Sequence, residues 1–440
     1  MSTKIAFIGG GSYQWGPKII VDIMLTPGLE ESEIYLDDIN SEAREDIRQV
    51  GTLLSERIGR GHQIISSSSK EEAFDGADAV VISISTGGLE AMRGDLEIPQ
   101  KYGIYQSVGD TAGPGGISRG LRNVPVFADL AGKIKKYCPD AIVINYTNPM
   151  TVLTRTLFKT EGLNAIGLCH EFFPFRNRVA ELAGAKSPTE LEYELLGVNH
   201  FIWLQSVQYQ GEEIMGKVKD YYAALKPRRL DGSDRPFAHN GRLQKELLAL
   251  YGSLPCAGPR HIAEFLPFVL GPEPEVMERW GFYLTSIEER YQIFKDAKTW
   301  IKNIIAGKVQ FEPKKSSETA SDIIACFVTK RGYFRDVMNL PNRGRVAYLP
   351  DEAVIETICE MKDGKIFPLV PGEFPYSLRG FLQTHVMIQE LTVEAALTGN
   401  RDLVLQALLL DPLTQLSKDK TEEMLKELIS YNQEYLPQFR

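Results

Sequence analysis

The 440-residue sequence contains only five cysteines, and no two of them form a Cys-x-x-Cys pair. An odd number of scattered cysteines does not suit a disulfide framework and is typical of a protein in a reducing compartment. The chain also lacks an apolar run of the roughly 18 residues that a membrane span requires, so we expect no membrane partner. The cysteines are Cys138, Cys169, Cys256, Cys326 and Cys359.

The sequence has no excess of basic residues. Its 49 lysines and arginines are outnumbered by 58 aspartates and glutamates, which gives a formal net charge of −9. Nucleic acids and anionic membranes attract basic surfaces, so we expect neither as a partner. Near the N-terminus, residues 4–9 form a strand-like segment that is too short for the apolar core of a signal sequence. We therefore expect a cytoplasmic protein whose partners are small molecules.

The first apolar segment has the pattern of a buried parallel strand. Residues 5–8 are continuously apolar, a glycine-rich turn follows, and residues 18–25 have a helical pattern. Glycines at such a turn let the backbone approach a pyrophosphate, while the helix N-terminus supplies donors and positive potential. The turn predicts a dinucleotide site, with Gly9, Gly11 and Ser12 as cofactor-binding residues.

The identity of this cofactor depends on the next strand. Gln14 stands where the third glycine of Gly-x-Gly-x-x-Gly would lie, and a strand-to-helix turn needs glycine even without a ligand. However, the apolar segment 34–36 ends in two aspartates, and Asp38 lies 27 positions after Gly11 (38 − 11). An acidic side chain at this place can bind the ribose hydroxyls of NAD and would repel the additional phosphate of NADP. The pattern therefore predicts NAD, bound partly by Asp38.

Further apolar strands at 79–83 and 141–144 alternate with helix-length segments. This alternation predicts a doubly wound parallel α/β sheet, which we assign to a cofactor-binding domain over residues 1–150. From residue 151 the pattern changes to longer helices mixed with short strands. It predicts an α+β domain over residues 151–440, with helices at 287–306, 384–396 and 421–435.

Two apolar segments end in side chains that bind metals. Residues 164–168 are followed by Cys169-His170-Glu171, and residues 195–198 by Asn199 and His200, 31 positions after Cys169 (200 − 169). This spacing is too long for a zinc knuckle but natural for two neighbouring strands. A thiolate and an imidazole with room for oxygen ligands predict an open metal site. The alternative is a buried structural cysteine and a hydrogen-bonded histidine.

Other polar residues stand close to glycine or to strand ends. Asp110 is the carboxylate within the glycine-rich segment 108–117, which predicts a backbone close to a ligand or simply a tight loop. Further along the chain, Glu264 follows His261 at a spacing that places both on one helix face, with Arg260 beside them.

Taken together, these segments resemble glycoside hydrolase family 4, whose NAD-dependent members depart from two-carboxylate hydrolysis. The resemblance covers nearly the whole chain and is highly specific. It implies a Rossmann-like fold similar to lactate and malate dehydrogenases, and a homodimer or homotetramer. It rests on residues 9–12, 109–116, 145–149, 169–171, 197–200, 339–344, 349–351 and 407–412.

The resemblance implies a glycosidase that uses NAD without consuming it. NAD would take hydride from C3 of the sugar, which makes the C2 proton acidic enough for a base. A divalent metal, manganese in this family, would be held by Cys169 and His200 and would polarise the ketone. The aglycone would leave by β-elimination, water would add to the double bond, and hydride would return to C3.

The resemblance also implies roles for individual residues. Asn148 would contact the sugar or cofactor, Asp110 would support the base, and His170 would be the general acid in place of an aspartate found in some relatives. Several relatives use a tyrosine as the base, which makes Tyr251 the candidate, with a pKa lowered by nearby carboxylates and metal. Glu264 is the alternative base, and Tyr251 can equally be a core residue.

The Cys-His-Glu triplet is similar to that of family members acting on unphosphorylated uronic acids. We therefore expect an α-galacturonidase, followed by an α-glucuronidase and then a neutral α-glucosidase or α-galactosidase. A uronate needs a cation, for which Arg260 is the first candidate and Arg119 and Arg93 are the others, although each can instead form a structural ion pair. A plain NAD-dependent dehydrogenase and a catalytically silent NAD sensor are the rival functions.

Overall fold

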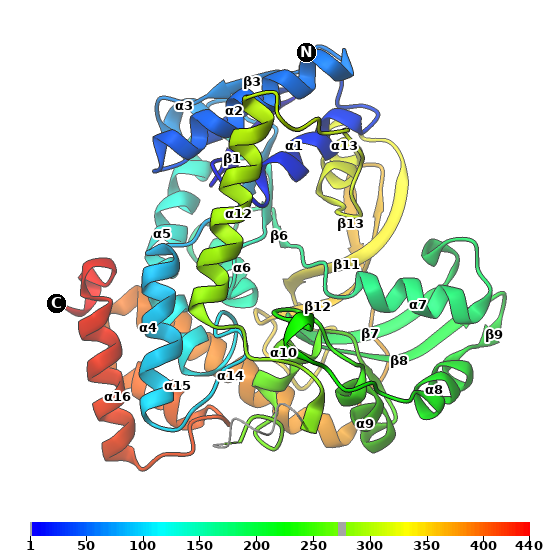
Figure 1. Ribbon diagram of the computed structural model, residues 1–440, viewed down its shortest axis with the longest axis vertical. Coiled ribbons are helices and arrows are strands. Elements are labelled where there is room, and N and C mark those ends of the chain that lie inside the picture. Colours follow the sequence, from blue (N-terminus) through cyan, green and yellow to red (C-terminus); the bar gives the residue numbers. More distant parts are fainter. Residues whose placement is uncertain (1, 272–278) are drawn as a thin grey trace.

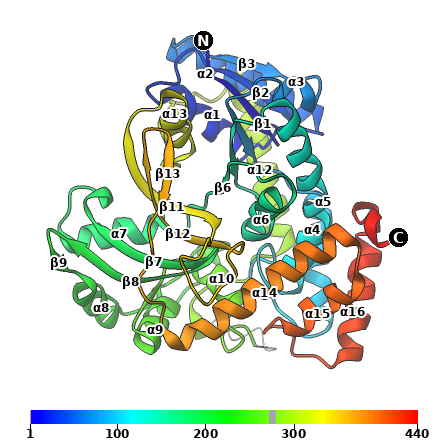
Figure 2. The same cartoon turned by 180° about the vertical axis from the view of Figure 1, so that it is seen from behind.

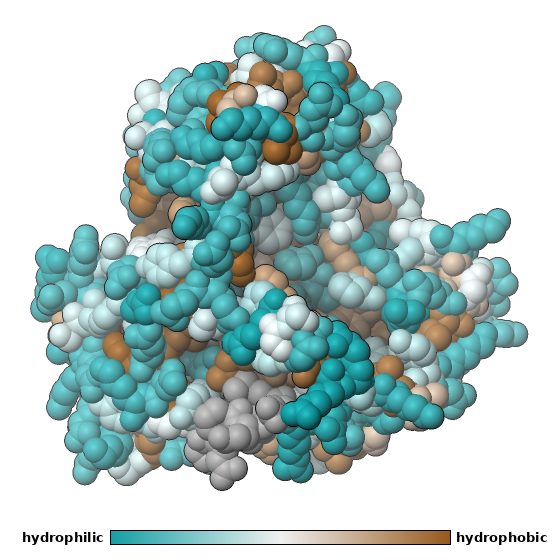
Figure 3. All heavy atoms as spheres, viewed as in Figure 1, coloured by the Kyte–Doolittle hydropathy of each residue, from teal (hydrophilic) through white to brown (hydrophobic). Residues whose placement is uncertain are grey.

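The computed structural model describes residues 2–271 and 279–440, and its strands form one continuous sheet. The strand order is β3-β2-β1-β4-β5-β6-β11-β12-β7-β8-β10, with β13 on β12 and β9 on β8. In Figure 1 the N-terminal strands lie at the top and β7 and β8 lie lower, and Figure 2 shows the same arrangement from behind. The face drawn in Figure 3 is largely hydrophilic and is hollowed between these upper and lower parts.

The first six strands are parallel and follow the order 3-2-1-4-5-6 of dinucleotide-binding sheets. This order confirms the predicted Rossmann-like, doubly wound α/β fold. The parallel part continues past residue 150, because β6 pairs with β5. The strands are β1 (Lys4–Ile8), β2 (Glu33–Asp37), β3 (Gln63–Ser66), β4 (Ala79–Ile82), β5 (Ile142–Asn145) and β6 (Ala165–Gly167).

The rest of the sheet is antiparallel and joins the parallel part where Asn339 pairs with Gly167. This junction brings the segments after β6 and β7 to the same region of the molecule. The strands are β7 (Glu192–Val198), β8 (Phe201–Tyr209), β9 (Glu212–Glu213), β10 (Leu254–Pro255), β11 (Tyr333–Pro341), β12 (Val354–Lys362) and β13 (Lys365–Pro368).

Helices cover the sheet and build the lower part of the molecule. Those predicted at 287–306, 384–396 and 421–435 correspond to α12, a longer α14, and α16. The helices are α1 (Gly16–Leu25), α2 (Ser41–Ile58), α3 (Lys70–Phe74), α4 (Gly88–Lys101), α5 (Gly113–Tyr137), α6 (Met150–Glu161), α7 (Phe173–Ala183), α8 (Met215–Ala224), α9 (Arg242–Tyr251), α10 (Pro259–Ile262), α12 (Ile287–Ile305), α13 (Ala320–Thr329), α14 (Tyr376–Thr398), α15 (Arg401–Leu410) and α16 (Lys418–Tyr431). Among the described helices, none is both long and apolar enough to cross a bilayer.

Strand β1 shows why the sheet is covered on both faces. Ile5 and Phe7 belong to the core cluster that contains the buried apolar residues of α1 and α2. Ala6 and Ile8, which point the other way, belong to the cluster that contains those of α5 and α6. A strand with both faces buried reads as a continuous apolar run, which is the pattern that the sequence shows.

Helix α12 connects the upper and lower parts of the molecule in Figure 1. Its N-terminus has a capping box, in which the side chains of Ser286 and Glu289 each accept from the other's backbone N–H. Near its C-terminal end, Lys302 pairs with Asp46 of α2 at 2.8 Å. The helix therefore fixes the loops at its N-terminal end relative to the parallel sheet.

Candidate active site

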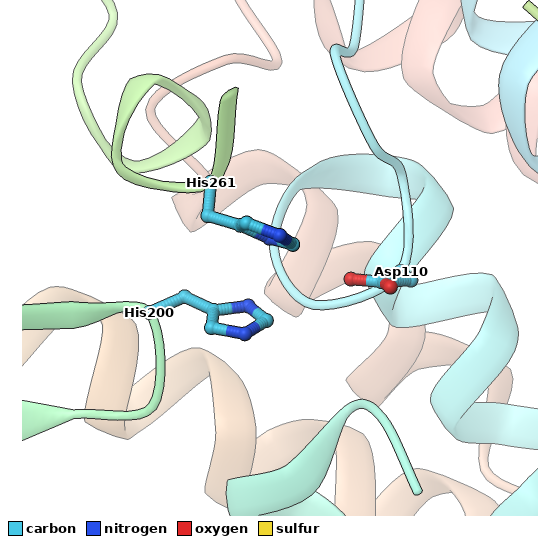
Figure 4. A group of neighbouring side chains, drawn as sticks. All are labelled: Asp110, His200 and His261. Atoms are coloured by element: carbon cyan, nitrogen blue, oxygen red, sulfur yellow. The ribbon is translucent and has the colours of Figure 1, made fainter. Parts of the chain in front are cut away.

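Polar side chains from distant parts of the sequence meet beyond the carboxyl ends of β5 and β6. Asp110 comes from the loop before α5, His200 from the turn between β7 and β8, and His261 from α10. One ligand atom from each lies within 4.8 Å of the others. In Figure 4 the two imidazoles face each other and the carboxylate of Asp110 lies beside them. The ring centroids of His200 and His261 are 3.9 Å apart.

The predicted metal pair is brought together. The Sγ atom of Cys169 lies 3.4 Å from Nε2 of His200. For an ion such as zinc, bonds of about 2.3 Å to sulfur and about 2.1 Å to nitrogen place the two ligand atoms about 3.1 to 3.6 Å apart at ordinary bond angles. On the other side of the ring, Nδ1 of His200 lies 2.9 Å from Oγ1 of Thr111, which orients the imidazole. The pair therefore fits a bound divalent metal.

His200 has an unusual backbone conformation. It lies in the two-residue turn between β7 and β8. Its φ of 68° is a backbone conformation that residues other than glycine rarely adopt. Gly197 makes the turn possible, because a Cβ there would lie 1.9 Å from the carbonyl oxygen of Phe201. Strained conformations of this kind collect at functional sites.

The two members of the pair differ in protonation. Burial, and after it the positive charge that His261 can carry, lowers the pKa of His200 to about 3, so its imidazole is neutral and can bind a cation. Burial, followed by the carboxylates of Glu356 and Glu171, raises the pKa of the Cys169 thiol well above its ordinary value. A metal that binds the thiolate must therefore displace a proton.

Asp110 links the metal pair to Asn148. Its Oδ1 accepts a 2.6 Å hydrogen bond from Oγ1 of Thr111, and its Oδ2 accepts a 3.3 Å bond from Nδ2 of Asn148. The backbone oxygen of Asn148 accepts from Nε of Arg119 at 2.9 Å. Burial opposes ionisation of Asp110, but the positive charges that His261, His200 and Arg119 can carry outweigh it, and the pKa of Asp110 lies below its ordinary range. The structure thus joins two predicted site residues, Asp110 and Asn148, in one network.

Glu264, the predicted alternative base, supports the loop that carries Asp110. Its Oε1 accepts hydrogen bonds from the backbone N–H groups of Val108 at 2.6 Å and Gly109 at 2.8 Å. Gly109 has a φ of 68°, which allows the sharp bend at this point. Burial raises the pKa of Glu264 to about 8. Its carboxyl group therefore holds backbone rather than facing an open site.

Tyr251 differs from the prediction. It ends α9, and its ring packs edge-on against Trp203 with centroids 5.5 Å apart. Burial raises the pKa of Tyr251, so the expectation of a lowered pKa is wrong. The physical reason is that the phenol lies against the apolar core, and a nearby carboxylate would raise rather than lower the pKa of a phenol.

His170 lies at the rim of the site, with 47% of its side chain exposed. The carboxylate oxygens of Glu171 and Glu318 lie 3.8 and 3.9 Å from its Nε2 and Nδ1. Glu171 also accepts a 2.5 Å hydrogen bond from the N–H of Gly258 and lies 3.7 Å from Nε2 of His261. Glu171 therefore ties the segment after β6 to α10.

The predicted NAD turn reaches this region through Trp15. Gly11 donates its N–H to Oδ2 of Asp38 at 3.0 Å, and Oγ of Ser12 accepts from the N–H of Trp15 at 3.1 Å. A Cβ at Gly9, whose φ is 83°, would lie 1.9 Å from the backbone oxygen of Ser83, which directly follows β4. The ring of Trp15 lies 5.5 Å from that of His170. The glycine turn and the Cys169 segment are thus neighbours.

The sequence did not assign a role to His261. Its spacing from Glu264 was visible, but on a helix that pattern is equally typical of an ordinary surface pair. In the structure, α10 ends at Ile262 and a 3₁₀ turn follows. The two side chains therefore serve different parts of the site: Glu264 holds the loop backbone, and His261 faces Asp110 and His200.

A dinucleotide-type sheet with a thiol and imidazole pair beyond its carboxyl edge defines a class of NAD- and metal-binding fold. The model of family 4 glycosyl hydrolases matches residues 4–185, and that of the family's C-terminal domain matches residues 195–414. The chain belongs to glycoside hydrolase family 4, as its sequence motifs predicted.

Among similar proteins is an α-galacturonidase of Thermoanaerobacter italicus, 35% identical over 98% of this chain and 97% of that protein. The crystal structure of LplD from Bacillus subtilis is 34% identical, with a TM-score of 0.90 over 97% of this chain and 99% of that one. A 6-phospho-β-glucosidase from Thermotoga maritima, with manganese, NAD⁺ and glucose-6-phosphate, is 24% identical and has a TM-score of 0.80 over 98% and 99%. This last likeness concerns the fold.

Proposed function

We propose that the protein is an NAD- and manganese-dependent glycosidase that releases α-linked galacturonic acid. The observation that carries the proposal is the 3.4 Å approach of Cys169 to His200 beside a glycine-rich dinucleotide turn, in a chain of family 4. The α-galacturonidase relative, similar over nearly its full length, supports the choice of sugar. α-Glucuronidase and neutral α-glucosidase or α-galactosidase are the alternatives within the family.

The residues present fit both cofactors. Gly9, Gly11, Ser12 and Asp38 would hold NAD⁺, and the thiolate of Cys169 with the imidazole of His200 would hold the metal. When bound, NAD⁺ would supply a hydride acceptor for C3 of the sugar, and manganese would supply a Lewis acid that polarises the resulting ketone. Asn148, which bonds to Asp110, would position the sugar between the two.

The chain's own side chains would move the protons. We propose His261 as the base that takes the C2 proton, in place of Tyr251. His261 is held beside Asp110 and His200, and its buried Nδ1 has no hydrogen-bond partner among the described residues. Burial lowers the pKa of His261 to about 3, so the imidazole is neutral but is a weak base unless its protonated form is stabilised. A carboxylate oxygen of Asp110 lies within 4.8 Å of a nitrogen of that imidazole and would stabilise its protonated form.

His170 would protonate the leaving oxygen. Its exposed ring lies at the rim of the site, where an aglycone would leave, and the carboxylates of Glu171 and Glu318 can orient it directly or through water. An imidazolium at this position can act as a general acid.

The direct test is hydrolysis by the purified protein with NAD⁺, manganese and a thiol reductant. The substrates are 4-nitrophenyl α-galacturonide, the α-glucuronide, the α-glucoside and the α-galactoside, each with and without EDTA. We expect release of nitrophenol from the galacturonide, loss of release with EDTA, and no net NADH. Faster release from another glycoside would identify that glycoside as the substrate in place of the galacturonide. Net formation of NADH from a free sugar or hydroxy acid would favour a dehydrogenase.

We further propose that the enzyme is cytoplasmic and assembles as a homodimer or homotetramer. Free thiols at all five cysteines support the reducing compartment. The oligomer can be measured by light scattering during size-exclusion chromatography.

A further inference from the structure

Three arginines beside the candidate active site, Arg119, Arg260 and Arg290, form no ion pair with a carboxylate among the described residues, and Arg119 is bound to the backbone oxygen of Asn148. Several buried arginines elsewhere in the fold do form ion pairs. Arg122, buried on α5, pairs with Asp95, and Arg155 and Arg176 also pair with carboxylates. Arg260 and Arg290 have no such ion pair among residues 2–271 and 279–440.

Both arginines are fixed by neutral acceptors near the loop that carries Asp110. Nη1 of Arg260 donates to Oγ1 of Thr285 at 2.7 Å, and Nη2 of Arg290 donates to the backbone oxygen of Val108 at 3.1 Å. The N–H of Thr285 in turn donates to the backbone oxygen of Ser107 at 3.2 Å. Residues 107–108 and 285–290 therefore hold the two guanidinium groups on the same side of the site.

These arginines retain unused donors. Nε of Arg290 is buried and has no hydrogen-bond partner among the described residues. Burial, Arg260 and Arg119 together lower the pKa of Arg290 to about 10 against the pull of Asp110, which still leaves it charged at neutral pH. Unpaired buried cations and donors are costly, so an anionic ligand would stabilise this arrangement.

The charges around the two arginines disfavour an anion with more than one negative charge. Arg260 lies near the carboxylates of Glu171 and Asp110, and Arg290 lies near Asp110. A uronate carboxylate carries one charge, whereas a sugar phosphate carries about 1.5 to 2. A planar carboxylate also matches the fork of a guanidinium.

We propose that Arg260 and Arg290 together bind the C6 carboxylate of the sugar and so determine the specificity for uronic acids. This inference rests on the proposed glycosidase function. It assigns specificity to two residues that are 30 positions apart (290 − 260) and lie on different elements, α10 and α12. Arg93, the third arginine that the sequence suggested, instead forms ion pairs with Glu97 at 2.7 Å and Glu288 at 2.9 Å.

The test compares Arg290→Gln and Arg260→Gln with Arg93→Gln, a matched control outside the proposed site. For 4-nitrophenyl α-galacturonide we expect kcat/KM to fall roughly 10- to 100-fold in the two site variants, mainly through KM, and to stay unchanged in the control. Activity on the neutral α-galactoside should not fall. Equal losses on both substrates would overturn the proposal, because they would indicate a purely structural role.

Binding without turnover separates this inference from the proposed function. Titration calorimetry measures the affinity of free galacturonate, galactose and galactose-6-phosphate for the same proteins loaded with NAD⁺ and manganese. We expect galacturonate to bind more tightly than the other two, and this preference to disappear in Arg290→Gln. Such binding without hydrolysis would support the carboxylate site while rejecting the glycosidase. Hydrolysis with an unaltered preference in the variants, or tighter binding of the phosphate, would reject the carboxylate site alone.

Discussion

The Sγ atom of Cys169 lies 3.4 Å from Nε2 of His200, although the two residues are 31 positions apart in the sequence. The turn between β7 and β8 presents the imidazole, and the end of β6 presents the thiol. β11 and β12, which come more than 100 residues later, lie between β6 and β7 in the sheet. The proposed metal site therefore depends on strand order rather than on a local motif.

Loss of this thiol should weaken metal binding. We expect Cys169→Ser to lower the affinity for Mn²⁺ by at least roughly 10-fold, because a hydroxyl is a poorer ligand than a thiolate. Electron paramagnetic resonance of free Mn²⁺ measures the affinity directly. Cys326→Ser on α13 is the control, since this buried cysteine lies outside the site. Equal affinities in both variants would contradict the assignment.

The role of the base can be tested through the C2 proton. We expect His261→Gln to reduce exchange of this proton for deuterium by about 10²-fold or more, a typical loss for a missing general base. Tyr251→Phe should exchange at nearly the wild-type rate, since its ring packs on Trp203. Proton NMR of the product sugar in deuterated buffer gives both rates. The opposite ranking would return the base to Tyr251.

The proposed acid should matter most for poor leaving groups. Nitrophenolate leaves without protonation, whereas the alkoxide of a sugar does not. We therefore expect His170→Gln to lower kcat about 10²- to 10⁴-fold on a galacturonate disaccharide and much less on the 4-nitrophenyl glycoside. If both substrates lose equal activity, His170 is not the acid for the leaving group.

Glu264 should make stability depend on pH. Its pKa rises from 4.5 to about 8 on folding, so between these values the unfolded chain binds fewer protons, and stability decreases as pH rises. The oxygen of glutamine can still accept from Val108 and Gly109. We expect the Tm of Glu264→Gln relative to wild type to be higher at pH 8 than at pH 5 by roughly 2 °C or more. Calorimetry at both pH values measures it, and a constant difference would contradict the shift.

The parallel sheet and the metal pair could be predicted because their signals are local. Continuous apolar runs such as 5–8 indicate buried strands, and a glycine turn followed by Asp38 indicates a dinucleotide site. The segment after each of two such strands supplied Cys169 and His200. The family's motifs then added roles for Asp110, Asn148 and His170 that remain predictions.

The base and the carboxylate site could not be predicted in this way, because they depend on how loops fold against one another. Sequence spacing gave no reason to assign His261 and Glu264 to different roles. It also could not decide whether Tyr251 is the base or a core residue. The surroundings of each side chain decided this: Glu264 accepts backbone hydrogen bonds, and Tyr251 packs on Trp203.

The sequence by itself therefore determined the α/β class, the cofactor turn, the metal-binding residue types and the family. The tertiary structure decided that His261 of α10 lies beside Asp110, and that Arg260 and Arg290 bond to neutral acceptors and form no ion pair within the described part of the chain. The physical reason is that strands and turns follow from short-range patterns. Burial and charge pairing, in contrast, depend on contacts between residues that are distant in the sequence.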